Sequence, residues 1–400
     1  MYNHTRREWL WKTASAVSGA YLTGSFLGRA AVAPASPVAV GRSKTYVPAE
    51  VLPVLEKMFD QLGGLGKLVK GKTVAIKINL TGELGYRLGR LPQEETHFTH
   101  PHVIAAAVHL MGKAGASRIR ILESPWSTVN PLEECLLQAN WEPRDILNAA
   151  PNVEFENTNY LGFGKKYARL VVPSGGLVYP AFDLNHSYQD CDVFVSIAKM
   201  KEHVTAGVTL SMKNCFGMTP CTIYGAGAGT DEPSRRPSGG RDPMHSGNRQ
   251  PSKSSPAEKD PHSPRQETWR VPRIVTDLVT ARPVHLAIID GIKTMTGGEG
   301  PWVRDDLKPA EPGVLLAGLN PVSTDAVAMA VMGFDPMAVR GTPPFERCDS
   351  TLQLAEGAGL GTRDLKRIEV VGTLIAQAKF DFAAIRQKRR AAPRSFWPWG

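Results

Sequence analysis

The sequence predicts an α/β fold with a mostly parallel, Rossmann-like doubly wound sheet, and three observations lead to it. Residues 73–80, 117–122, 193–197 and 285–290 are short apolar runs rich in Val and Ile, typical of strands buried on both faces of a parallel sheet. A helical pattern over residues 101–113 separates the first two runs, as in a strand–helix–strand unit with a right-handed crossover. Polar side chains follow these runs, as they do at the ligand-binding edge of an open α/β sheet.

Composition and charge set limits on the class of protein. The 400 residues are 42% hydrophobic and 21% charged, which is ordinary for a globular chain. The formal net charge of +9 is concentrated near the two ends of the chain, so charge alone does not predict a nucleic-acid-binding protein.

The five cysteines are scattered and form no CxxC pair. This spacing argues against a zinc ribbon and a ferredoxin-type iron–sulfur motif. Cys215 and Cys221 are near enough in sequence to pair in an oxidising compartment. Alternatively, the cysteines are small buried hydrophobic side chains.

Residues 1–33 predict a signal peptide. Residues 5–12, TRREWLWK, resemble a twin-arginine (Tat) export signal, and residues 31–33 (AVA) form a small-x-small cleavage pattern. We therefore expect the chain to meet the twin-arginine translocase and to reach the periplasm folded. The alternative is an uncleaved anchor or a disordered tail. No stretch of the chain has the roughly 20 apolar residues of a stable membrane span.

After the leader, we expect one α/β domain over residues 34–380 and a basic tail over 381–400. The first half should begin with a helix that glycines break near residue 63, followed by the strand–helix–strand unit. Short strands should form a small β elaboration, and Thr205 is a candidate N-cap. The further expected elements are helices over residues 46–69, 131–150 and 205–213, and strands over 153–156, 168–172 and 177–179.

The second half should resume the sheet after a long polar segment. Asp325 is expected to cap a helix, and residues 297–302 form a glycine-rich turn whose N–H groups could approach an anion. The further expected elements are helices over residues 272–280, 326–332 and 351–357, and strands over 285–290, 313–317 and 367–371.

Residues 225–268 interrupt this pattern. They are nearly free of large apolar groups and dense in Gly, Pro, Ser and charged residues, which predicts a disordered insert. Such an insert is either a lid over a site or a solvated loop without a role.

Cations and amides gather after two of the predicted strands. Alternate residues of a strand share a face, so pairs two positions apart should project together. Several ammonium groups in one crevice repel each other unless an anion neutralises them, which points to a phosphate or carboxylate ligand. The alternative is solvated lysines on exposed loops. The candidate ligand-binding residues are Lys77, Asn79, Lys199, Lys201, Lys213 and Asn214.

Histidines and acids nearby could move protons or bind a metal. His203 is a candidate catalytic acid or base. His100 and His102 could hold a divalent metal, although their spacing matches no strong ligand motif. Asp290 and Glu299 could act as an acid–base pair or bind a cation. The chain lacks GxGxxG, Walker and GxSxG patterns, so neither a nucleotide nor a serine hydrolase is indicated.

Six blocks in this order resemble the domain of unknown function 362 (DUF362) family. The resemblance implies an α/β sheet domain and brings no activity. Some relatives carry ferredoxin-type cysteine motifs, which this chain lacks. The blocks are VAIKINL around Lys77, THP at 99–101 before a helix ending in KAGA, KMKEH at 199–203, KNCFG at 213–217, IIDGI to GGEGP over 288–301, and AGLNPVSTDAVA over 317–328.

Together these features predict an exported enzyme that acts on a small phosphate- or carboxylate-bearing substrate, with metal assistance as one option and an unknown cofactor. The first alternative is a non-catalytic anion-binding, metal-binding or redox-accessory protein of the cell envelope. The second is a cell-envelope interaction protein that works through its basic tail.

Overall fold

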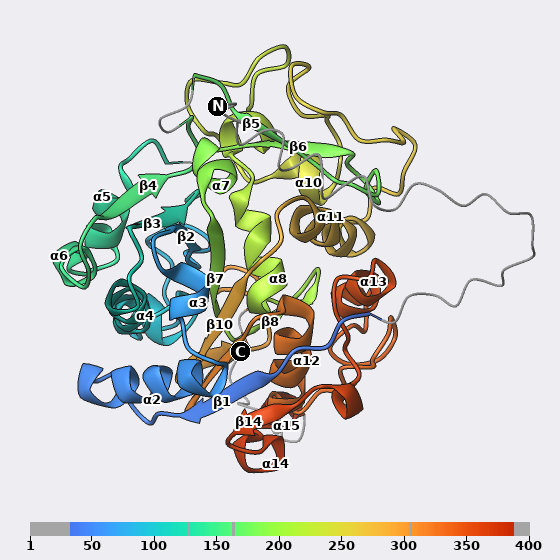
Figure 1. Ribbon diagram of the computed structural model, residues 1–400. Coiled ribbons are helices and arrows are strands. Elements are labelled where there is room, and N and C mark those ends of the chain that lie inside the picture. Colours follow the sequence, from blue (N-terminus) through green and yellow to red (C-terminus); the bar gives the residue numbers. More distant parts are fainter. Residues whose placement is uncertain (1–32, 127, 162–164, 305, 388–400) are drawn as a thin grey trace, which may run out of the picture. The chain divides into compact units, whose positions relative to one another are not determined.

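An eight-stranded sheet runs through the computed structural model, which describes residues 33–126, 128–161, 165–304 and 306–387 (Figure 1). The strand order is β14-β1-β13-β10-β7-β2-β3-β4. β13 is antiparallel to both neighbours, and the other described pairs are parallel. The predicted mostly parallel α/β fold is confirmed. The strands are β1 (Val38–Arg42), β2 (Thr73–Lys77), β3 (Arg118–Glu123), β4 (Val153–Asn157), β7 (Val193–Lys199), β10 (Leu286–Gly291), β13 (Val314–Gly318) and β14 (Val370–Gly372).

Helices cover both faces of the sheet, as Figure 1 shows. One layer holds α2 (Pro48–Gln61), α3 (Gly66–Val69), α4 (Pro101–Lys113), α5 (Leu132–Gln138) and α6 (Pro143–Leu147). The other layer holds α8 (Leu210–Asn214), α11 (Glu267–Ala281), α12 (Pro321–Val331) and α13 (Thr351–Gly357). Along β7, Val193 and Val195 join the apolar cluster of the first layer, whereas Phe194 joins that of the second. This alternation is the pattern expected for a strand buried on both faces.

Short hairpins and helices complete the chain. Of three two-stranded sheets, the first lies where the small β elaboration was predicted, and the other two were not foreseen. The three sheets are β5 (Ala168–Val171) with β6 (Ala181–Leu184), β8 (Glu202–His203) with β9 (Gly207–Val208), and β11 (Thr294–Thr296) with β12 (Lys308–Ala310). The short helices are η1 (Gln93–Glu95), α7 (His186–Asp190), η2 (Cys215–Met218), α9 (Cys221–Tyr224), α10 (Asp242–His245), η3 (Leu365–Arg367), α14 (Ile375–Ala378) and α15 (Phe382–Gln387).

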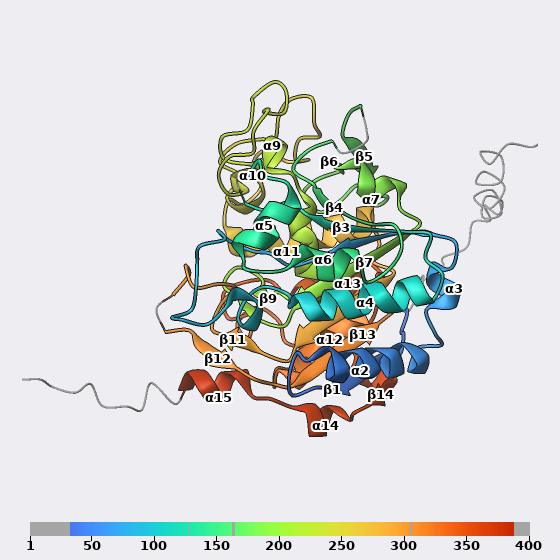
Figure 2. The same cartoon turned by 90° about the vertical axis from the view of Figure 1, so that its left-hand side faces the viewer.

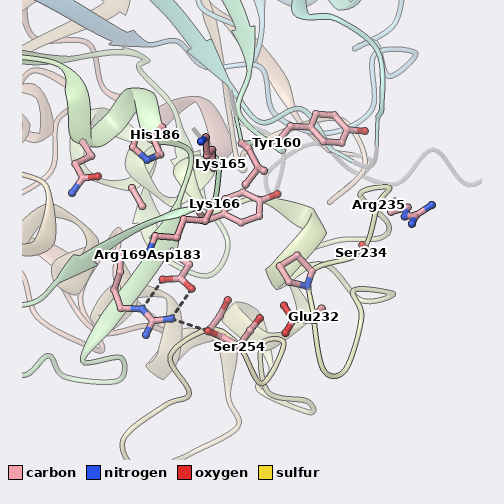
Figure 3. Close-up of a pocket in the computed structure, with 16 residues that line it drawn as sticks. Tyr160, Lys165, Lys166, Arg169, Asp183, His186, Glu232, Ser234, Arg235 and Ser254 are labelled. Atoms are coloured by element: carbon pink, nitrogen blue, oxygen red, sulfur yellow. Dashed lines mark hydrogen bonds and ion pairs between the residues drawn. The ribbon is translucent and has the colours of Figure 1, made fainter. Parts of the chain in front are cut away.

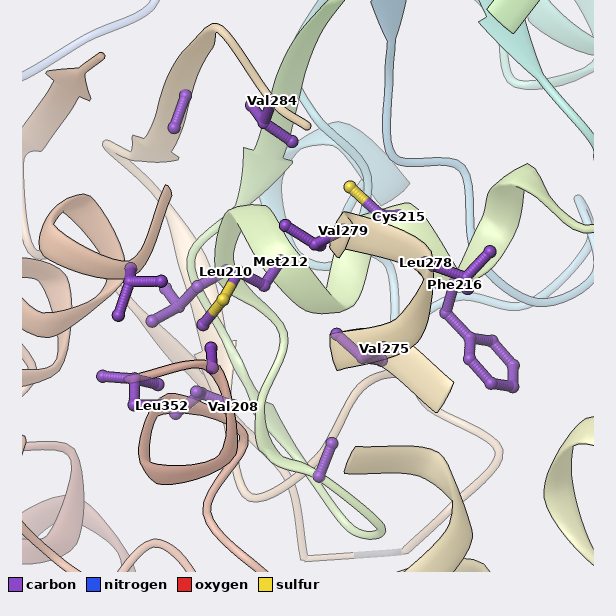
Figure 4. Close-up of a cluster of buried hydrophobic side chains, with 14 of the residues drawn as sticks. Val208, Leu210, Met212, Cys215, Phe216, Val275, Leu278, Val279, Val284 and Leu352 are labelled. Atoms are coloured by element: carbon purple, nitrogen blue, oxygen red, sulfur yellow. The ribbon is translucent and has the colours of Figure 1, made fainter. Parts of the chain in front are cut away.

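The helix α8 and the turn after it pack one apolar side against α11 (Figure 4). Leu210, Met212 and Phe216 are buried in this cluster with Val275 and Leu278 of α11. Burying such a side chain stabilises the fold by about 1.5–3 kcal/mol. This packing fixes the orientation of α8, so that its polar residues Lys213 and Asn214 lie at the edge of the sheet.

Several sequence-based assignments of elements are wrong. The expected helix over 131–150 is two helices, because Asn140 takes a left-handed conformation (φ 65°) between them. The expected helix over 205–213 begins only at Leu210, since the β8–β9 hairpin takes up the residues before it, and Thr205 is not its cap. The strand expected at 177–179 forms at 181–184 instead, and the strand β1 was not foreseen.

Asp325 was expected to cap its own helix, but it does not. Asn320 is the N-cap of α12, and its side chain accepts from Ser323 N. Asp325 lies inside α12 and accepts hydrogen bonds from the backbone N–H groups of Ser211 and Met212 at 2.9 and 3.0 Å. Asp325 therefore fixes the beginning of α8, although the two helices lie more than a hundred residues apart in the chain.

The segment 225–268 is not a disordered insert. Figure 2 places its loops together with α9 and α10 at one end of the sheet. Met244 is fully buried, and Glu258 pairs with the buried Arg270 at 2.8 Å. Arg249 donates to the carbonyl groups of Ala226 and Ala228. Charge-assisted hydrogen bonds order this segment where apolar residues are scarce, because a buried charge bonded in this way replaces its lost hydration.

The two ends of the chain are described in part. From Ala33 on, the described residues belong to one unit. α15 falls within the predicted basic tail, yet its Phe382 is fully buried. Residues 1–32 of the export signal predicted over residues 1–33, and the tail residues 388–400, lie outside the described residues. Over the part of the chain that is described, no helix is both long and apolar enough to cross a membrane.

The position of Asp325 gives a prediction for the pH dependence of stability. Burial raises the pKa of Asp325 to about 7, against the opposing effect of three donors from Ser211 and Met212. An acid whose pKa is raised on folding binds an extra proton in the native state, so its stabilising contribution is lost as the pH rises from about 4 through about 7.

We therefore expect the loss of stability caused by Asp325→Asn to shrink as the pH rises from about 5 to about 8, by at least about 1 kcal/mol. Urea unfolding of both proteins at the two pH values measures this difference. A loss that grows with pH would show instead that the donors dominate and that the carboxylate is the favoured form.

Candidate functional site

The candidate site lies where the order of the parallel strands reverses. The chain adds β3 and β4 on one side of β2 and then returns to place β7 on its other side. In open α/β sheets, ligands bind beyond the carboxyl ends of the strands at such a reversal. Asn79 follows β2 and Lys201 follows β7, and Lys201 Nζ donates to Asn79 Oδ1 at 2.8 Å across the gap.

A cavity of about 70 Å³ opens at this point. It has room for about two water molecules or an anion of a few heavy atoms. Besides polar neighbours from β3 and the segment 225–268, it is lined by these residues expected from the sequence: Lys77, Asn79, Lys201, His203, Lys213 and Asn214.

Lys77 is neutralised within the wall of the cavity. Its ammonium lies 2.5 Å from Glu123 Oε1 and donates to Ile78 O at 2.7 Å. Glu123 also accepts from the backbone N–H groups of Leu80 and Ser124. A Cβ atom at Gly217 would lie 2.9 Å from Lys77 Nζ, so the pair can form because residue 217 has no side chain. Glu123 was not foreseen as a site residue, although it ends a predicted strand.

Lys201 is fully buried, and its amino group donates to neutral partners. Its ammonium donates to Asn79 Oδ1 and to the carbonyl oxygen of His97. No carboxylate of the described residues lies within ion-pair distance. Burial lowers the pKa of Lys201 well below its usual value, and Glu299 partly offsets this shift.

Asn214 joins the ends of two strands, β2 and β7, to α8. Its Oδ1 accepts from Asn79, and its Nδ2 donates to Lys77 O at 3.2 Å and to Ser196 Oγ at 3.0 Å. Every polar atom of this amide is used within the protein, so Asn214 acts as a brace for Asn79 and the strand ends.

Lys213 is different from the other two lysines of the cavity. It is partly exposed, and its Nζ lies 4.4 Å from the centroid of the Phe216 ring. Within the described ranges, its ammonium makes no hydrogen bond and no ion pair. Burial, with Arg241 and Lys77 adding to it and Glu299 opposing it, lowers the pKa of Lys213 to about 7.

Arg241 adds a further cation from the segment 225–268. It donates to Thr219 O at 2.8 Å, to Ser124 O at 2.8 Å and to Ser124 Oγ at 2.7 Å. It lines the cavity and has no carboxylate at ion-pair distance among the residues described. Arg241 was not foreseen as a site residue, because the composition of its segment indicated disorder.

Two buried polar atoms in the wall of the cavity have no partner within the described part of the chain. They are the indole Nε1 of Trp126 and the hydroxyl Oγ1 of Thr209. A buried donor without an acceptor costs about 1–3 kcal/mol, and such atoms in a folded protein point to a missing ligand or water. Neither residue was singled out from the sequence.

His203 borders the cavity as a neutral base. Burial, together with Lys213, His245 and Lys201, lowers its pKa well below the usual value. Its Nδ1 accepts from Thr205 N at 3.2 Å, so the proton of the neutral ring lies on Nε2. His203 also borders a second, open cleft of about 1000 Å³.

Glu299 lies near His203 without forming a proton relay through Nδ1. Its Oε2 is 3.7 Å from His203 Nδ1 and accepts from Val204 N at 3.0 Å. Burial raises the pKa of Glu299. Glu299 therefore stabilises the turn after β8 and acts on the cavity through its charge.

Lys199 and Asp290 do not line the cavity, contrary to expectation. Lys199 Nζ lies 2.9 Å from Asp290 Oδ2 and 2.8 Å from the Tyr46 hydroxyl, and both charged residues are fully buried. Asp290 also accepts from Tyr46 Oη and from His100 N. Because its oxygens are used in this way, Asp290 forms no pair with Glu299. Lys199 and Asp290 instead hold the ends of their two strands together beside the cavity.

The histidines proposed as metal ligands have structural partners. His100 caps α4 through a hydrogen bond from His102 N and stacks on Tyr46 at 3.6 Å. His102 Nδ1 contacts Tyr46 O at 2.8 Å. Among residues 33–387, gaps aside, no group of three or more His, Cys, Asp and Glu side chains could hold a metal ion. The metal assignment thus has no support in this geometry.

The glycine-rich turn and the cysteines also have local explanations. Gly297 N donates to the carboxylate of Glu202 (Oε2 at 2.6 Å), so this N–H group is not free to bind an anionic ligand. A Cβ atom at Gly300 would clash with the Trp302 ring at 1.9 Å. The five cysteines are buried and free, so Cys215 and Cys221 do not pair here.

A larger surface pocket of about 990 Å³ lies between the β5–β6 hairpin and the segment 225–268 (Figure 3). Arg169 crosses it with hydrogen bonds to Asp183 at 2.8 and 2.9 Å and to Ser254 O at 2.8 Å. Because these bonds use the guanidinium to join two segments of the chain, we assign this pocket a structural role.

Comparisons with known proteins support a family and no activity. A family profile described as a domain of unknown function (DUF362) matches residues 74–330. A thylakoid-associated protein of Synechocystis sp. is 25% identical over 316 residues, which cover 78% of each chain. A crystal structure of a Thermotoga maritima protein aligns over 80% of this chain and 60% of that one, with 12% identity and a TM-score of 0.36. The present chain thus spans about 60% of the length of that protein.

The pKa of Lys213 predicts how anion binding should vary with pH. Lys213 loses its charge as the pH rises through about 7, so the affinity for oxalate, a dianion throughout this range, should fall between about pH 6 and about pH 8. The substitution Lys213→Met should weaken binding at the lower pH and abolish most of the pH dependence. Isothermal titration calorimetry at constant ionic strength measures both effects. A variant that keeps the full pH dependence would show that another group is responsible.

Proposed function

Because the chain belongs to the DUF362 family, whose description names no activity, we propose a function from the cavity itself. The protein binds a small phosphate- or carboxylate-bearing compound between β2, β7 and the segment 225–268, and it acts on this compound as an enzyme. The observation that supports the proposal most strongly is that three groups lining the cavity have no hydrogen-bond partner among the described residues. They are Lys213 Nζ, Trp126 Nε1 and Thr209 Oγ1.

The balance of charge around the cavity favours an anion. Lys201, Lys213 and Arg241 have no carboxylate at ion-pair distance within the described residues, and Lys77 is matched by Glu123. Cations close together in a poorly hydrated site repel each other by several kcal/mol at an effective dielectric constant near 20. A bound anion removes this repulsion, whereas a neutral molecule leaves it in place.

The unpartnered donors favour oxygen atoms on the ligand. Trp126 Nε1 can only donate, and Thr209 Oγ1 can donate or accept. A carboxylate or phosphate has enough acceptor positions to satisfy these groups and the ammonium of Lys213 together. The volume of about 70 Å³ restricts the part of the ligand inside the cavity to a small anionic group.

One group at the cavity is matched to proton transfer at neutral pH, because Lys213 has a pKa of about 7. A group whose pKa lies near the working pH is the most effective general acid or base. His203, whose pKa burial lowers well below the usual value, is a neutral imidazole and a weaker base. The pKa of Lys213 supports turnover over simple storage of the anion. Stoichiometric binding of the physiological ligand without turnover would identify the alternative, a non-catalytic anion-binding protein of the cell envelope.

The segment 225–268 supplies a matched pair of arginines that tests the anion site. Arg241 and Arg249 are both partly buried and both donate to main-chain carbonyl groups, but only Arg241 lines the cavity. Losing one charge-assisted hydrogen bond costs about 1.5–3 kcal/mol, which corresponds to roughly 10- to 100-fold in affinity.

We expect Arg241→Gln to weaken oxalate and inorganic phosphate binding by this factor, and Arg249→Gln to leave it unchanged. Calorimetric titration of the three proteins at one ionic strength gives the comparison, and circular dichroism checks that each is folded. Equal affinities for the two variants would remove Arg241 from the site.

We also propose that the chain is exported folded into the periplasm by the twin-arginine translocase. Arg6 and Arg7 in the motif TRREWLWK support this proposal, as do the weakly apolar run after it and the small-x-small pattern at residues 31–33.

Replacing both arginines with lysine should leave the uncleaved precursor in the cytoplasm, because the translocase reads the arginine pair. Immunoblots of cytoplasmic and periplasmic fractions measure this outcome, with Lys12→Arg as the control that should be exported normally. Undiminished periplasmic protein in the double variant would contradict the assignment.

A further inference from the structure

We propose that Lys213 is a nucleophilic amine that forms an imine with a small anionic carbonyl compound, such as a two- or three-carbon oxo acid. This inference rests on the proposed anion site and names the substrate class and the bond that forms there. The amine is supplied by Lys213, and the carboxylate is held by the other cations of the cavity.

Lys213 is the lysine of the cavity whose nitrogen is available. Lys77 is committed to Glu123 and Lys201 to Asn79 and His97. Lys213 Nζ makes no hydrogen bond or ion pair with any residue that the structure describes, and its side chain is partly exposed. An incoming carbonyl carbon can therefore reach this nitrogen without breaking an existing bond.

The surroundings of Lys213 favour the neutral amine. Burial is the largest cause of its lowered pKa, and nearby cations add to it. With a pKa of about 7, about half of the amine is neutral at pH 7, compared with on the order of one in a thousand for an ordinary lysine. Desolvation and neighbouring cations are the usual ways to activate a lysine nucleophile. The charged or titratable groups around it are Lys77, Lys201, His203, Arg241, His245, Cys215, Glu123 and Glu299.

The other donors of the cavity define where the carboxylate would lie. Lys201 and Arg241 provide charge, and Trp126 Nε1 provides an unused donor. In a cavity of about 70 Å³, a carboxylate held by these groups leaves its adjacent carbonyl carbon beside Lys213. A two- or three-carbon oxo acid has this arrangement of groups, whereas phosphate has no electrophilic carbon.

The reaction is balanced without an oxidant or reductant. The lone pair of Lys213 Nζ attacks the carbonyl carbon, and the carbonyl π electrons move to oxygen. The oxygen takes up protons and leaves as water, so that amine, carbonyl compound and one proton give a protonated imine and water. Solvent water exchanges these protons, because Lys213 is partly exposed. The protonated imine keeps a positive charge over the Phe216 ring, which lies 4.4 Å from Nζ.

Reductive trapping tests this inference on the full chain. The protein is incubated with glyoxylate or pyruvate and sodium cyanoborohydride near pH 7, and the modified lysines are mapped by peptide mass spectrometry. We expect the adduct on Lys213 to exceed that on the exposed Lys67 at least about tenfold, because of its larger neutral fraction. An excess of oxalate, which has no aldehyde or ketone group to form an imine, should suppress the adduct on Lys213 and leave that on Lys67 unchanged.

The variants Lys213→Arg and Lys67→Arg complete the design. Lys213→Arg keeps a cation, so it should still bind oxalate but lose the selective adduct, whereas Lys67→Arg should keep both. Labelling spread evenly over exposed lysines, or no adduct on Lys213 in a wild-type protein that binds oxalate, would overturn the imine and leave the anion site standing. Failure of the wild-type protein to bind oxalate or phosphate would instead overturn the proposed function itself.

Discussion

Positive charge held in a small cavity without a matching number of carboxylates is the constraint on which this site depends. Lys77, Lys201, Lys213 and Arg241 border the cavity, and Glu123 is the one carboxylate that pairs with any of them among the residues described. Removing ammonium groups from water costs several kcal/mol for each ion. The protein offsets part of this cost with carbonyl and amide oxygens. The remaining cost is offset only when a ligand binds. Without a ligand, burial and mutual repulsion therefore lower the pKa values of Lys201 and Lys213.

The fold produces this arrangement through contacts between distant parts of the chain. The reversal of strand order between β2 and β7 opens the gap at the edge of the sheet. Asp325 fixes the beginning of α8, and the apolar side of α8 packs on α11, so Lys213 and Asn214 lie at this edge. The segment 225–268 contributes Arg241 to the lining of the cavity. Lys199 and Asp290 neutralise each other on neighbouring strands beside the cavity.

The sequence predicted the sheet and much of the cavity because both follow from local patterns. Lys77 and Lys201 could be found because they lie at or just after the ends of buried strands, where the carboxyl ends of parallel strands meet. Lys213 could be found because it lies in the polar stretch that follows the second of these strands. The separate fate of Lys199 could not be predicted, since Asp290 lies 91 residues away in the sequence. Arg241 was missed because composition does not reveal long-range hydrogen bonds. Trp126 carried a weak signal, since it lies just after the predicted strand over 117–122, whereas Thr209 fell inside an expected helix and carried none.

The most direct test of the central claim is a crystal structure of the protein soaked in selenate, whose position anomalous scattering identifies. The account predicts one selenate ion in the cavity, in contact with Lys201, Lys213 and Arg241 and accepting from Trp126 Nε1. A cavity that holds only water while selenate occupies other sites would contradict it.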